Sequence, residues 1–366
     1  MDNNFKRQGK LNASDQKKSK FCLCSLGHWC QRFLYSCVIT VACLVSVAIA
    51  ITVVIGLRVQ TTNVPKLLGN HAENLTYVST TTDPNNFTFI MAGDIKRGTA
   101  TFTYMLDLAR ADKPAFAVIL GDFTSKPELA RHRLFVSKMA RQALPYPVFL
   151  VPGNHDLGPD EPFQLKDYEE TYGPAQFHFT IGQHLFIFLN NSPPYDKTGG
   201  YLKFLEQVAS ERAKQVQNIF VFMHVPPSGL NPWIKAHALH ESEKFMQRAK
   251  ELGIRYVFTG DHHGYVKTEK DGTTYIVTGG GGARLRGTHG RFYHLTRIAV
   301  QDGMITETVI IGEKRFETLN HLERNIAVHL WPLITQNFVS IAVTTILFGI
   351  MIWLLVFSVR GLKRTG

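Results

Sequence analysis

The stretch Leu150-Val151-Pro152-Gly153-Asn154-His155-Asp156 places three polar side chains directly after a short apolar run. Residues 147–151 are typical of a buried strand, and the Pro-Gly pair that follows indicates a turn. After the turn, an amide oxygen can bind a metal ion, an imidazole can transfer a proton, and a carboxylate can orient that imidazole. Asn-His-Asp is also ordinary loop chemistry, so its meaning depends on what the other strand ends carry.

Four further predicted strands, 87–91, 115–120, 219–223 and 254–258, end in the same kinds of residue. These are Gly93-Asp94, Gly121-Asp122, His224 and Gly260-Asp261-His262-His263. Because the loops at the carboxyl edge of an open α/β sheet meet in one crevice, we expect these side chains to converge. Glycine before each acidic residue is expected to let the backbone turn tightly. Carboxylate, amide and imidazole ligands without thiolate favour Mn, Fe, Zn or Co over a structural zinc site.

The central region alternates predicted strands and helices before it ends in hairpins. Helices are expected at 99–111, 127–144, 201–214 and 241–252, and further strands at 177–181, 184–190, 273–277, 292–300 and 305–311. This order predicts an α/β (α+β) fold in which a pair of mixed sheets is flanked by helices.

The size and charge of the chain limit the classes of function that it can have. A chain of 366 residues, 45% of them hydrophobic, supports one large domain plus extra segments. Of the net charge of +11, residues 1–32 carry +5 and the last seven residues +3, which leaves +3 for everything between. No basic stripe favours nucleic acid as a partner. All five cysteines lie in the first 43 residues, so the main domain has no thiolate metal site, and the role of these thiols stays open.

Two uncharged apolar segments, 33–57 and 338–359, are long enough to cross a bilayer. The alternative is a pair of buried or interfacial helices. Lys and Arg lie outside both segments, so the positive-inside rule predicts cytoplasmic termini and an extracytoplasmic domain that is periplasmic, lumenal or extracellular. We therefore expect a disordered basic cytoplasmic tail (1–32), a first transmembrane helix, a domain (60–335), a second transmembrane helix and a basic tail (360–366). Sequons at Asn74 and Asn86 fit a lumenal face, although such triplets also arise by chance.

The joint pattern resembles the calcineurin-like metallophosphoesterase superfamily over residues 87–311. The resemblance includes Tyr172-Gly173-Pro174 and the run Thr278-Gly279-Gly280-Gly281-Gly282-Ala283. It implies a two-sheet β sandwich flanked by helices, with one or two divalent ions (Mn, Fe or Zn) at its edge. It implies that Asp122 bridges the ions, that Asn154, His224 and Asp261 hold one, and that Asp94 and His263 hold the other. It also implies that His155 protonates the leaving oxygen and that Asp156 orients His155.

Two residues depart from the family pattern. Lys96 stands where most members have a histidine ligand, and a protonated lysine cannot bind a metal. Asp261 replaces another histidine but can still act as a ligand. We expect Lys96 and Arg97 to bind substrate as cations, and His262 is an alternative ligand.

The resemblance implies a hydrolase that cleaves a phosphate ester or pyrophosphate with metal-activated water. The two predicted spans favour a lipid-linked substrate, and loop 230–236 with Trp233 could form an apolar lip over the site. The alternatives are a nucleotide or cyclic-nucleotide phosphodiesterase and a degenerate, non-catalytic binding domain.

Overall fold

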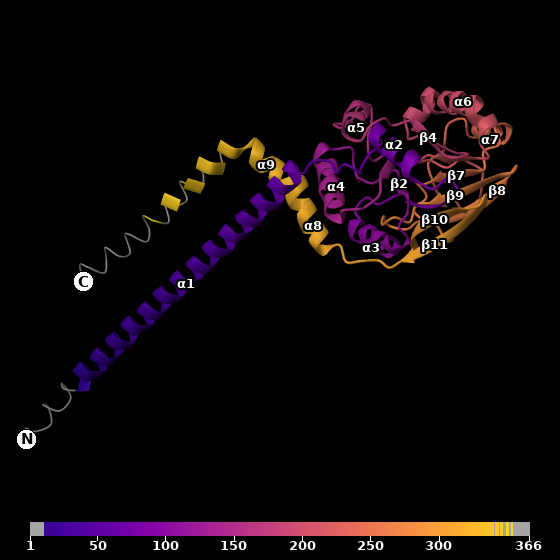
Figure 1. Cartoon of the computed structure of the whole chain (residues 1–366). Coiled ribbons are helices and arrows are strands. Elements are labelled where there is room, and N and C mark those ends of the chain that lie inside the picture. The colour runs from indigo at the N-terminus through magenta and orange to yellow at the C-terminus, as the bar shows by residue number, and fades with distance from the viewer. Residues whose placement is uncertain (1–10, 340, 344, 347–348, 351–352, 354–366) are drawn as a thin grey trace, which may run out of the picture. The chain divides into compact units, whose positions relative to one another are not determined.

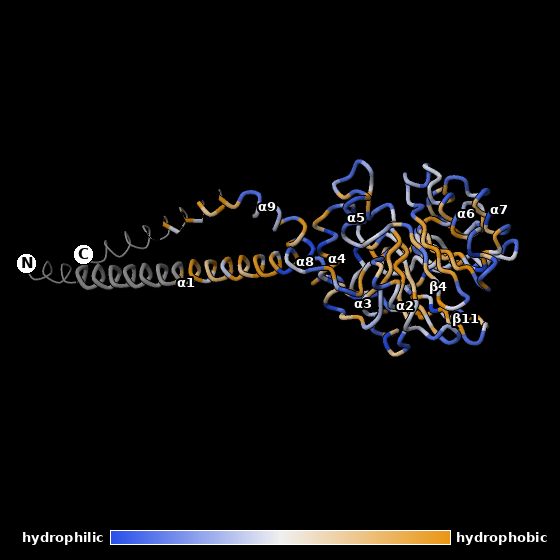
Figure 2. The backbone as a smooth tube through the Cα atoms, turned by 45° about the horizontal axis from the view of Figure 1, so that its top comes forward, coloured by the Kyte–Doolittle hydropathy of each residue, from blue (hydrophilic) through white to orange (hydrophobic). Residues whose placement is uncertain are grey.

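The computed structural model describes residues 11–339, 341–343, 345–346, 349–350 and 353, and the chain divides into two units, Met1–Ile55 and Gly56–Gly366. The first unit holds most of helix α1 (Leu11–Thr61), whose stretch Ser36–Thr61 is long and apolar enough to cross a membrane (Figure 2). The prediction of disorder is wrong for residues 11–32, because α1 has no proline and an existing helix extends at little cost. Most of the predicted second span, 338–359, lies outside the described residues.

The second unit is built on two mixed sheets, here named sheet A and sheet B. Sheet A has the strand order β11-β10-β1-β2-β3, and sheet B the order β4-β5-β6-β7-β9-β8. The strands of sheet A are β1 (Asn86–Ala92), β2 (Phe116–Leu120), β3 (Val148–Val151), β10 (Tyr293–Gln301) and β11 (Met304–Gly312). The strands of sheet B are β4 (Phe177–Ile181), β5 (His184–Phe188), β6 (Asn218–Phe222), β7 (Tyr256–Thr259), β8 (Tyr265–Lys270) and β9 (Thr273–Thr278). In each sheet the central strands run parallel, so their carboxyl ends share one edge.

Helices cover the outer faces of both sheets (Figure 1). Residues of α3 (Thr99–Ala109), α4 (Leu129–Gln142) and α5 (Leu165–Tyr172) share one buried cluster with sheet A. Residues of α6 (Gly200–Arg212) and α7 (Ser242–Glu251) share another with sheet B. The remaining helices are α2 (Ala72–Thr81), α8 (Thr318–Arg324), a π-helix (Asn325–Leu330) and α9 (Trp331–Gln336), with 3-10 turns at Arg110–Asp112, Tyr195–Thr198 and Ala213–Gln215. The predicted architecture of two mixed sheets flanked by helices is confirmed.

An aromatic core holds the two sheets face to face. Phe89 and Phe116 of sheet A stack with ring centroids 5.0 Å apart, and Phe186 and Phe220 of sheet B stack at 5.1 Å. Across the interface, Phe89 meets Phe186 edge to face at 5.6 Å. Each such pair contributes about 0.5–1.5 kcal/mol beyond its buried area. This packing fixes one sheet against the other, so that strand ends from both sheets meet.

The predicted strands and helices of the central region begin and end within two residues of the observed ones. The sequence did not predict β8, because its residues beyond Val266 are polar and mostly exposed and show no clear alternation. It also missed α2, α5 and the helices between Thr318 and Gln336. The side chain of Asn74 in α2 is buried and donates to the carbonyl of Gly69, so the first sequon is inaccessible in the folded domain.

Candidate metal centre

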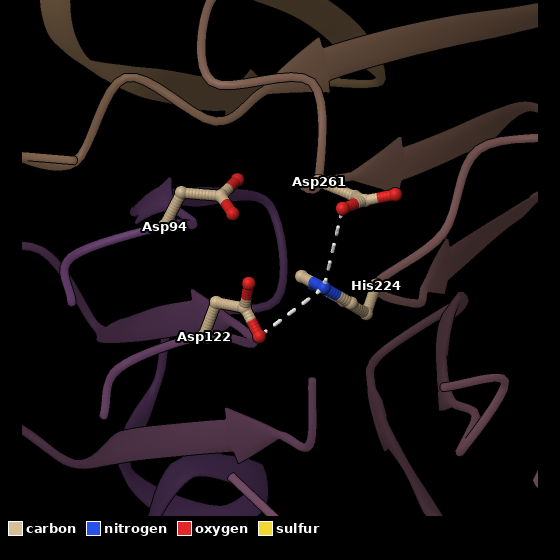
Figure 3. A group of neighbouring side chains, drawn as sticks. All are labelled: Asp94, Asp122, His224 and Asp261. Atoms are coloured by element: carbon tan, nitrogen blue, oxygen red, sulfur yellow. Dashed lines mark ion pairs between the residues drawn. The ribbon is translucent and has the colours of Figure 1, made fainter. Parts of the chain in front are cut away.

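Four buried side chains meet at the shared edge of the two sheets. Ligand atoms of Asp94, Asp122, His224 and Asp261 all lie within 4.8 Å of one another. Figure 3 shows these four side chains on loops, with Asp94 and Asp122 after β1 and β2 and His224 and Asp261 after β6 and β7. The ligands come from both sheets, because β1 and β2 belong to sheet A and β6 and β7 to sheet B. The expected convergence of these side chains is observed.

The backbone at the three aspartates is left-handed. The φ angles of Asp94, Asp122 and Asp261 are 61°, 55° and 60°. This conformation costs about 1–2 kcal/mol in a residue with a Cβ, and such cost concentrates at functional sites. At Asp94 and Asp261 the acidic residue itself turns the chain in place of the preceding glycine, whereas Gly121 before Asp122 is left-handed as predicted, with a φ angle of 78°. Gly93 and Gly260 instead allow close approach, since a Cβ there would lie 2.8 or 2.6 Å from the carbonyl oxygen of Leu120.

Three histidines of the site share one arrangement. The Nδ1–H group donates to a backbone carbonyl in each, from His224 to Leu120 at 2.8 Å, from His263 to Arg284 at 2.8 Å and from His155 to Ser125 at 3.0 Å. Such a bond fixes the ring and leaves Nε2 as the nitrogen that can bind a metal or exchange a proton. The Nε2 atom of His224 lies 3.3 Å from Oδ1 of Asn154 and 3.5 Å from Oδ1 of Asp122.

Two atoms that accept hydrogen bonds, one on Asp94 and one on His263, lie next to each other. Nε2 of His263 is 3.2 Å from Oδ1 of Asp94. Burial, and next the charge of Lys96, lowers the pKa of His263 to about 4, so this nitrogen carries no proton at neutral pH. Both carboxylate oxygens of Asp94 are buried and accept no hydrogen bond from the described residues. A buried charge without a partner is costly, so this pair of acceptors fits a cation between them.

Charges within the centre shift the other titrating groups. Burial, reinforced by the charge of Asp122, raises the pKa of Asp94 well above its usual value. Burial also opposes ionisation of Asp122, but His224 and Lys96 outweigh it and lower the pKa of this carboxyl. The ammonium of Lys96 lies 2.8 Å from Oδ2 of Asp122. Burial alone would lower the pKa of His224. The three neighbouring carboxylates outweigh burial, so the pKa of His224 is raised. Carboxylate, amide and imidazole donors of this kind fit a divalent transition metal.

The role expected of Asp156 is wrong. Its carboxylate accepts hydrogen bonds from the backbone N–H groups of Asp122 at 2.6 Å, Thr124 at 2.8 Å and Gly153 at 2.9 Å. The imidazole of His155 is held by the carbonyl of Ser125. Asp156 therefore positions the loop that carries Asp122, because its carboxylate binds the backbone on both sides of Phe123. The backbone N–H of His155 donates to Oδ1 of Asp122 at 2.9 Å.

The sequence analysis missed two residues that support the later half of the centre. Nδ1 of His237 lies 2.9 Å from Oδ2 of Asp261, and the backbone N–H of His237 donates to the same oxygen. Oδ1 of Asn191 accepts the backbone N–H groups of His224 and Val225. Asn191 follows β5, so the rule that picked out the other strand ends could have found it. His237 lies in a loop with no such signal.

The remaining predicted residues lie in or around the metal centre. Lys96 belongs to the centre, and Arg97 is exposed beside it. The ring of His262 accepts the backbone N–H of Lys235 at Nδ1 and is outside the group of four ligands. Trp233 is partly exposed and lies against His289, with ring centroids 3.7 Å apart.

A family model described as calcineurin-like phosphoesterase matches residues 87–265. Residues 87–265 thus form a calcineurin-like phosphoesterase domain. The matched range contains all four buried ligands of the centre, Asp94, Asp122, His224 and Asp261.

Three known proteins illustrate the likeness. The serine/threonine-protein phosphatase CPPED1 of Rattus norvegicus is 26% identical over 205 residues, which cover 49% of this chain and 63% of that protein. The 3',5'-cyclic adenosine monophosphate phosphodiesterase CpdA of Haemophilus influenzae is 25% identical over 190 residues, or 49% of this chain and 66% of that protein. The chain thus spans less than two thirds of the length of either relative. A solved structure of a dimetal phosphatase from Danio rerio aligns with a TM-score of 0.49 and 12% identity, covering 63% of this chain and 97% of that chain.

Proposed function

We propose that this metallophosphoesterase is a membrane-anchored, metal-dependent hydrolase that cleaves a phosphate ester or pyrophosphate. The observation that carries the proposal is the group of four buried ligands, drawn from two sheets, whose ligand atoms lie within 4.8 Å of one another. The orphaned oxygens of Asp94 add weight, because a metal ion would supply the charge they lack.

The ligands divide into two sets around Asp122. Asn154, His224 and Asp261 would hold one ion (Mn, Fe or Zn), Asp94 and His263 would hold a second, and Asp122 would be shared. Such ions neutralise phosphate charge and lower the pKa of a bound water. Lys96 would act as a fixed cation beside Asp122, where its ammonium stabilises negative charge on the substrate.

The general acid in this proposal is His155. The carbonyl of Ser125 fixes its Nδ1–H, which leaves Nε2 to donate a proton to the departing oxygen. Asp156 contributes as a positioning residue through the backbone of Asp122. Lys96 and Arg97 would contact the phosphate oxygens.

Membrane attachment supports a lipid-linked substrate. The stretch Ser36–Thr61 would anchor the chain, and 338–359 would form a second span, with both termini cytoplasmic and the domain extracytoplasmic. Trp233, which is 45% exposed, would then contact an apolar chain of the substrate. The similarity to CpdA favours a second candidate, a cyclic-nucleotide phosphodiesterase whose anchor only sets its location.

The test combines metal analysis with hydrolysis by the full chain in detergent. Mass spectrometry of the metal content after growth with Mn, Fe or Zn should find one or two ions per chain. An aryl phosphate assay should detect turnover that His155→Ala lowers by about 10²–10⁴-fold, the range for loss of a general acid. The exposed His321→Ala is the matched control and should retain activity.

Substrate panels then separate the candidates. Activity on lipid phosphates above that on nucleotides supports the lipid-linked reading, and activity confined to soluble or cyclic nucleotides supports the alternative. A chain that binds no metal and hydrolyses no phosphoester would be a non-catalytic binding domain, and the proposal would fail.

A further inference from the structure

A pocket beside the metal centre is lined by five cationic side chains. These belong to Lys96, Arg97, Arg131, Lys138 and Arg324, and none of the described residues that line the pocket is acidic. The pocket has a volume of about 40 Å³. This is room for roughly three waters, or about one phosphate group.

Three of the five cations are already paired. Lys96 lies 2.8 Å from Asp122, Arg131 lies 2.7 Å from Glu128, and Lys138 lies 2.6 Å from Glu323. Arg97 and Arg324 have no ion pair with any described part of the chain. Two guanidinium groups are therefore left facing one pocket without a counter-ion.

The surroundings of Arg324 disfavour its positive charge on balance. Burial lowers the pKa of Arg324 and the positive charges of Arg97 and Arg131 lower it further, whereas the charge of Glu317 opposes them. Like charges held together without a partner are destabilising, and an anion between them would remove this cost. A guanidinium presents a planar fork of N–H donors that matches phosphate oxygens.

The wall that carries Arg324 is firmly held. Its neighbour in α8, Glu323, is buried and accepts from Lys138 at 2.6 Å, from Arg58 at 2.5 Å and from Arg141 at 3.0 Å. Lys138 also donates to Asn320, which lines the pocket. The cationic wall is thus a built part of the domain.

The pocket is continuous with the metal centre through two residues. Lys96 lines the pocket and contacts Asp122. Ser125 lines the pocket too, and its carbonyl holds His155 while its hydroxyl accepts from Arg131 at 2.9 Å. A ligand that occupies both places must carry two anionic groups close together.

We propose that this pocket binds a second phosphate group of the substrate, which makes the substrate class a diphosphate. This inference rests on the proposed function, since it assumes that the other phosphate lies at the metal centre. The second phosphate is held by Arg97 and Arg324 and is not itself attacked. The diphosphate can belong to a membrane lipid or to a soluble nucleotide, and both share this chemistry.

The binding test uses the full chain in detergent, stripped of metal with a chelator that is then dialysed away. Inorganic pyrophosphate should raise the melting temperature of the wild type in a saturable manner. Arg324→Gln should weaken pyrophosphate binding by about tenfold, the loss of one charge-assisted hydrogen bond. Arg324→Lys should bind with intermediate affinity, because it keeps the charge and loses the fork.

Controls separate binding from misfolding. Arg133→Gln removes the same charge from an exposed position of α4 and should bind pyrophosphate as the wild type does. The melting temperature of each variant without ligand reports whether it folds. If folded Arg324→Gln binds pyrophosphate as tightly as the wild type, the inference is wrong.

The specificity test compares kcat/KM of the metal-loaded chain for p-nitrophenyl phosphate, a nucleoside diphosphate and an alkyl diphosphate in detergent micelles. The wild type should favour at least one diphosphate over the aryl phosphate, and Arg324→Gln should lower that preference about tenfold. Preference for the alkyl compound identifies a lipid source, and preference for the nucleoside compound a soluble one. Equal efficiency on single phosphates and diphosphates would overturn the inference. Arginine-dependent pyrophosphate binding without any hydrolysis would support the pocket and count against the proposed hydrolase alone.

Discussion

The two halves of the metal centre differ in how many hydrogen bonds the protein itself supplies to their carboxylates. Asp261, after sheet B strand β7, accepts hydrogen bonds from His237, and these together with His224 outweigh burial and lower its pKa. Asp94, after sheet A strand β1, is equally buried, yet its oxygens accept no hydrogen bond from the described residues and its pKa is raised. One half is therefore complete without an ion, whereas the other is suited to receive one.

Asp122 stands between these extremes. It belongs to the sheet A half, but Lys96 supplies a cation 2.8 Å away. The chain thus places its own positive charge where the resemblance to the family led us to expect a histidine ligand. This difference between the halves leads to four predictions.

Replacing the shared carboxylate should have the largest effect. Asp122→Asn removes the group that both sets of ligands share, and we expect kcat for an aryl phosphate to fall by at least about 10³-fold. Asp107→Asn, at an exposed position of α3, is the matched control and should leave kcat unchanged. An active Asp122→Asn would mean that the two halves work independently.

Neutralising Asp94 and Asp261 should shift stability in opposite directions when metal is absent. Asp94→Asn removes a buried charge that has no partner, so the metal-free domain should gain about 1–3 kcal/mol. Asp261→Asn breaks contacts with His237 and should lose a similar amount. Each kilocalorie corresponds to about 2–4 °C in the melting temperature of a domain of this size. Scanning calorimetry with a chelator present measures the sign of each change in melting temperature. Equal changes in the two variants would mean that the two halves do not differ.

Acid should weaken the support beneath the sheet A half. His132 is buried, accepts from Tyr172 and donates to the carbonyl of Asp156, and burial lowers its pKa to about 3. The unfolded chain binds this proton below pH 6.5 and the folded chain does not. Stability from this group is therefore complete above pH 6.5 and is lost as pH falls towards 3, at about 1.4 kcal/mol per unit. Urea unfolding should show that the free energy of unfolding declines less between pH 7 and pH 5 in His132→Gln than in the exposed-site variant His321→Gln.

Restoring the usual histidine should have the smallest effect. Lys96→His removes the ammonium beside Asp122 and adds a neutral donor, so the second ion should bind about tenfold more tightly. Metal content measured at limiting Mn reports this change. Unchanged stoichiometry would show that Lys96 does not set the occupancy of the Asp94 side.

The ligand positions were predictable because each follows an apolar strand. Gly121-Asp122 and Gly260-Asp261 could be found from local patterns alone, and the strands before them fixed which edge they occupy. Which strands belong to which sheet was not predictable from those strands, because the packing of one sheet on the other depends on contacts such as Phe89 with Phe186, far apart in sequence.

Contacts made through space explain the other gaps. The carboxylate of Asp156 was assigned to its neighbour His155, but it bonds the backbone of Asp122, which lies 34 residues earlier. Arg324 carries no local signal, since its place beside Arg97 depends on how α8 docks through Glu323. Sequence periodicity reports which face of an element is buried and not which distant element covers it.

The left-handed backbone at Asp94, Asp122 and Asp261 decides how an inactive form of this protein should be made. Asparagine tolerates that backbone at least as well as aspartate does, whereas a β-branched side chain would distort the turn. An asparagine variant can therefore lose turnover and keep the shape of the site. Such a chain could retain an uncleaved molecule from a cell extract long enough for mass spectrometry to reveal what this protein acts on.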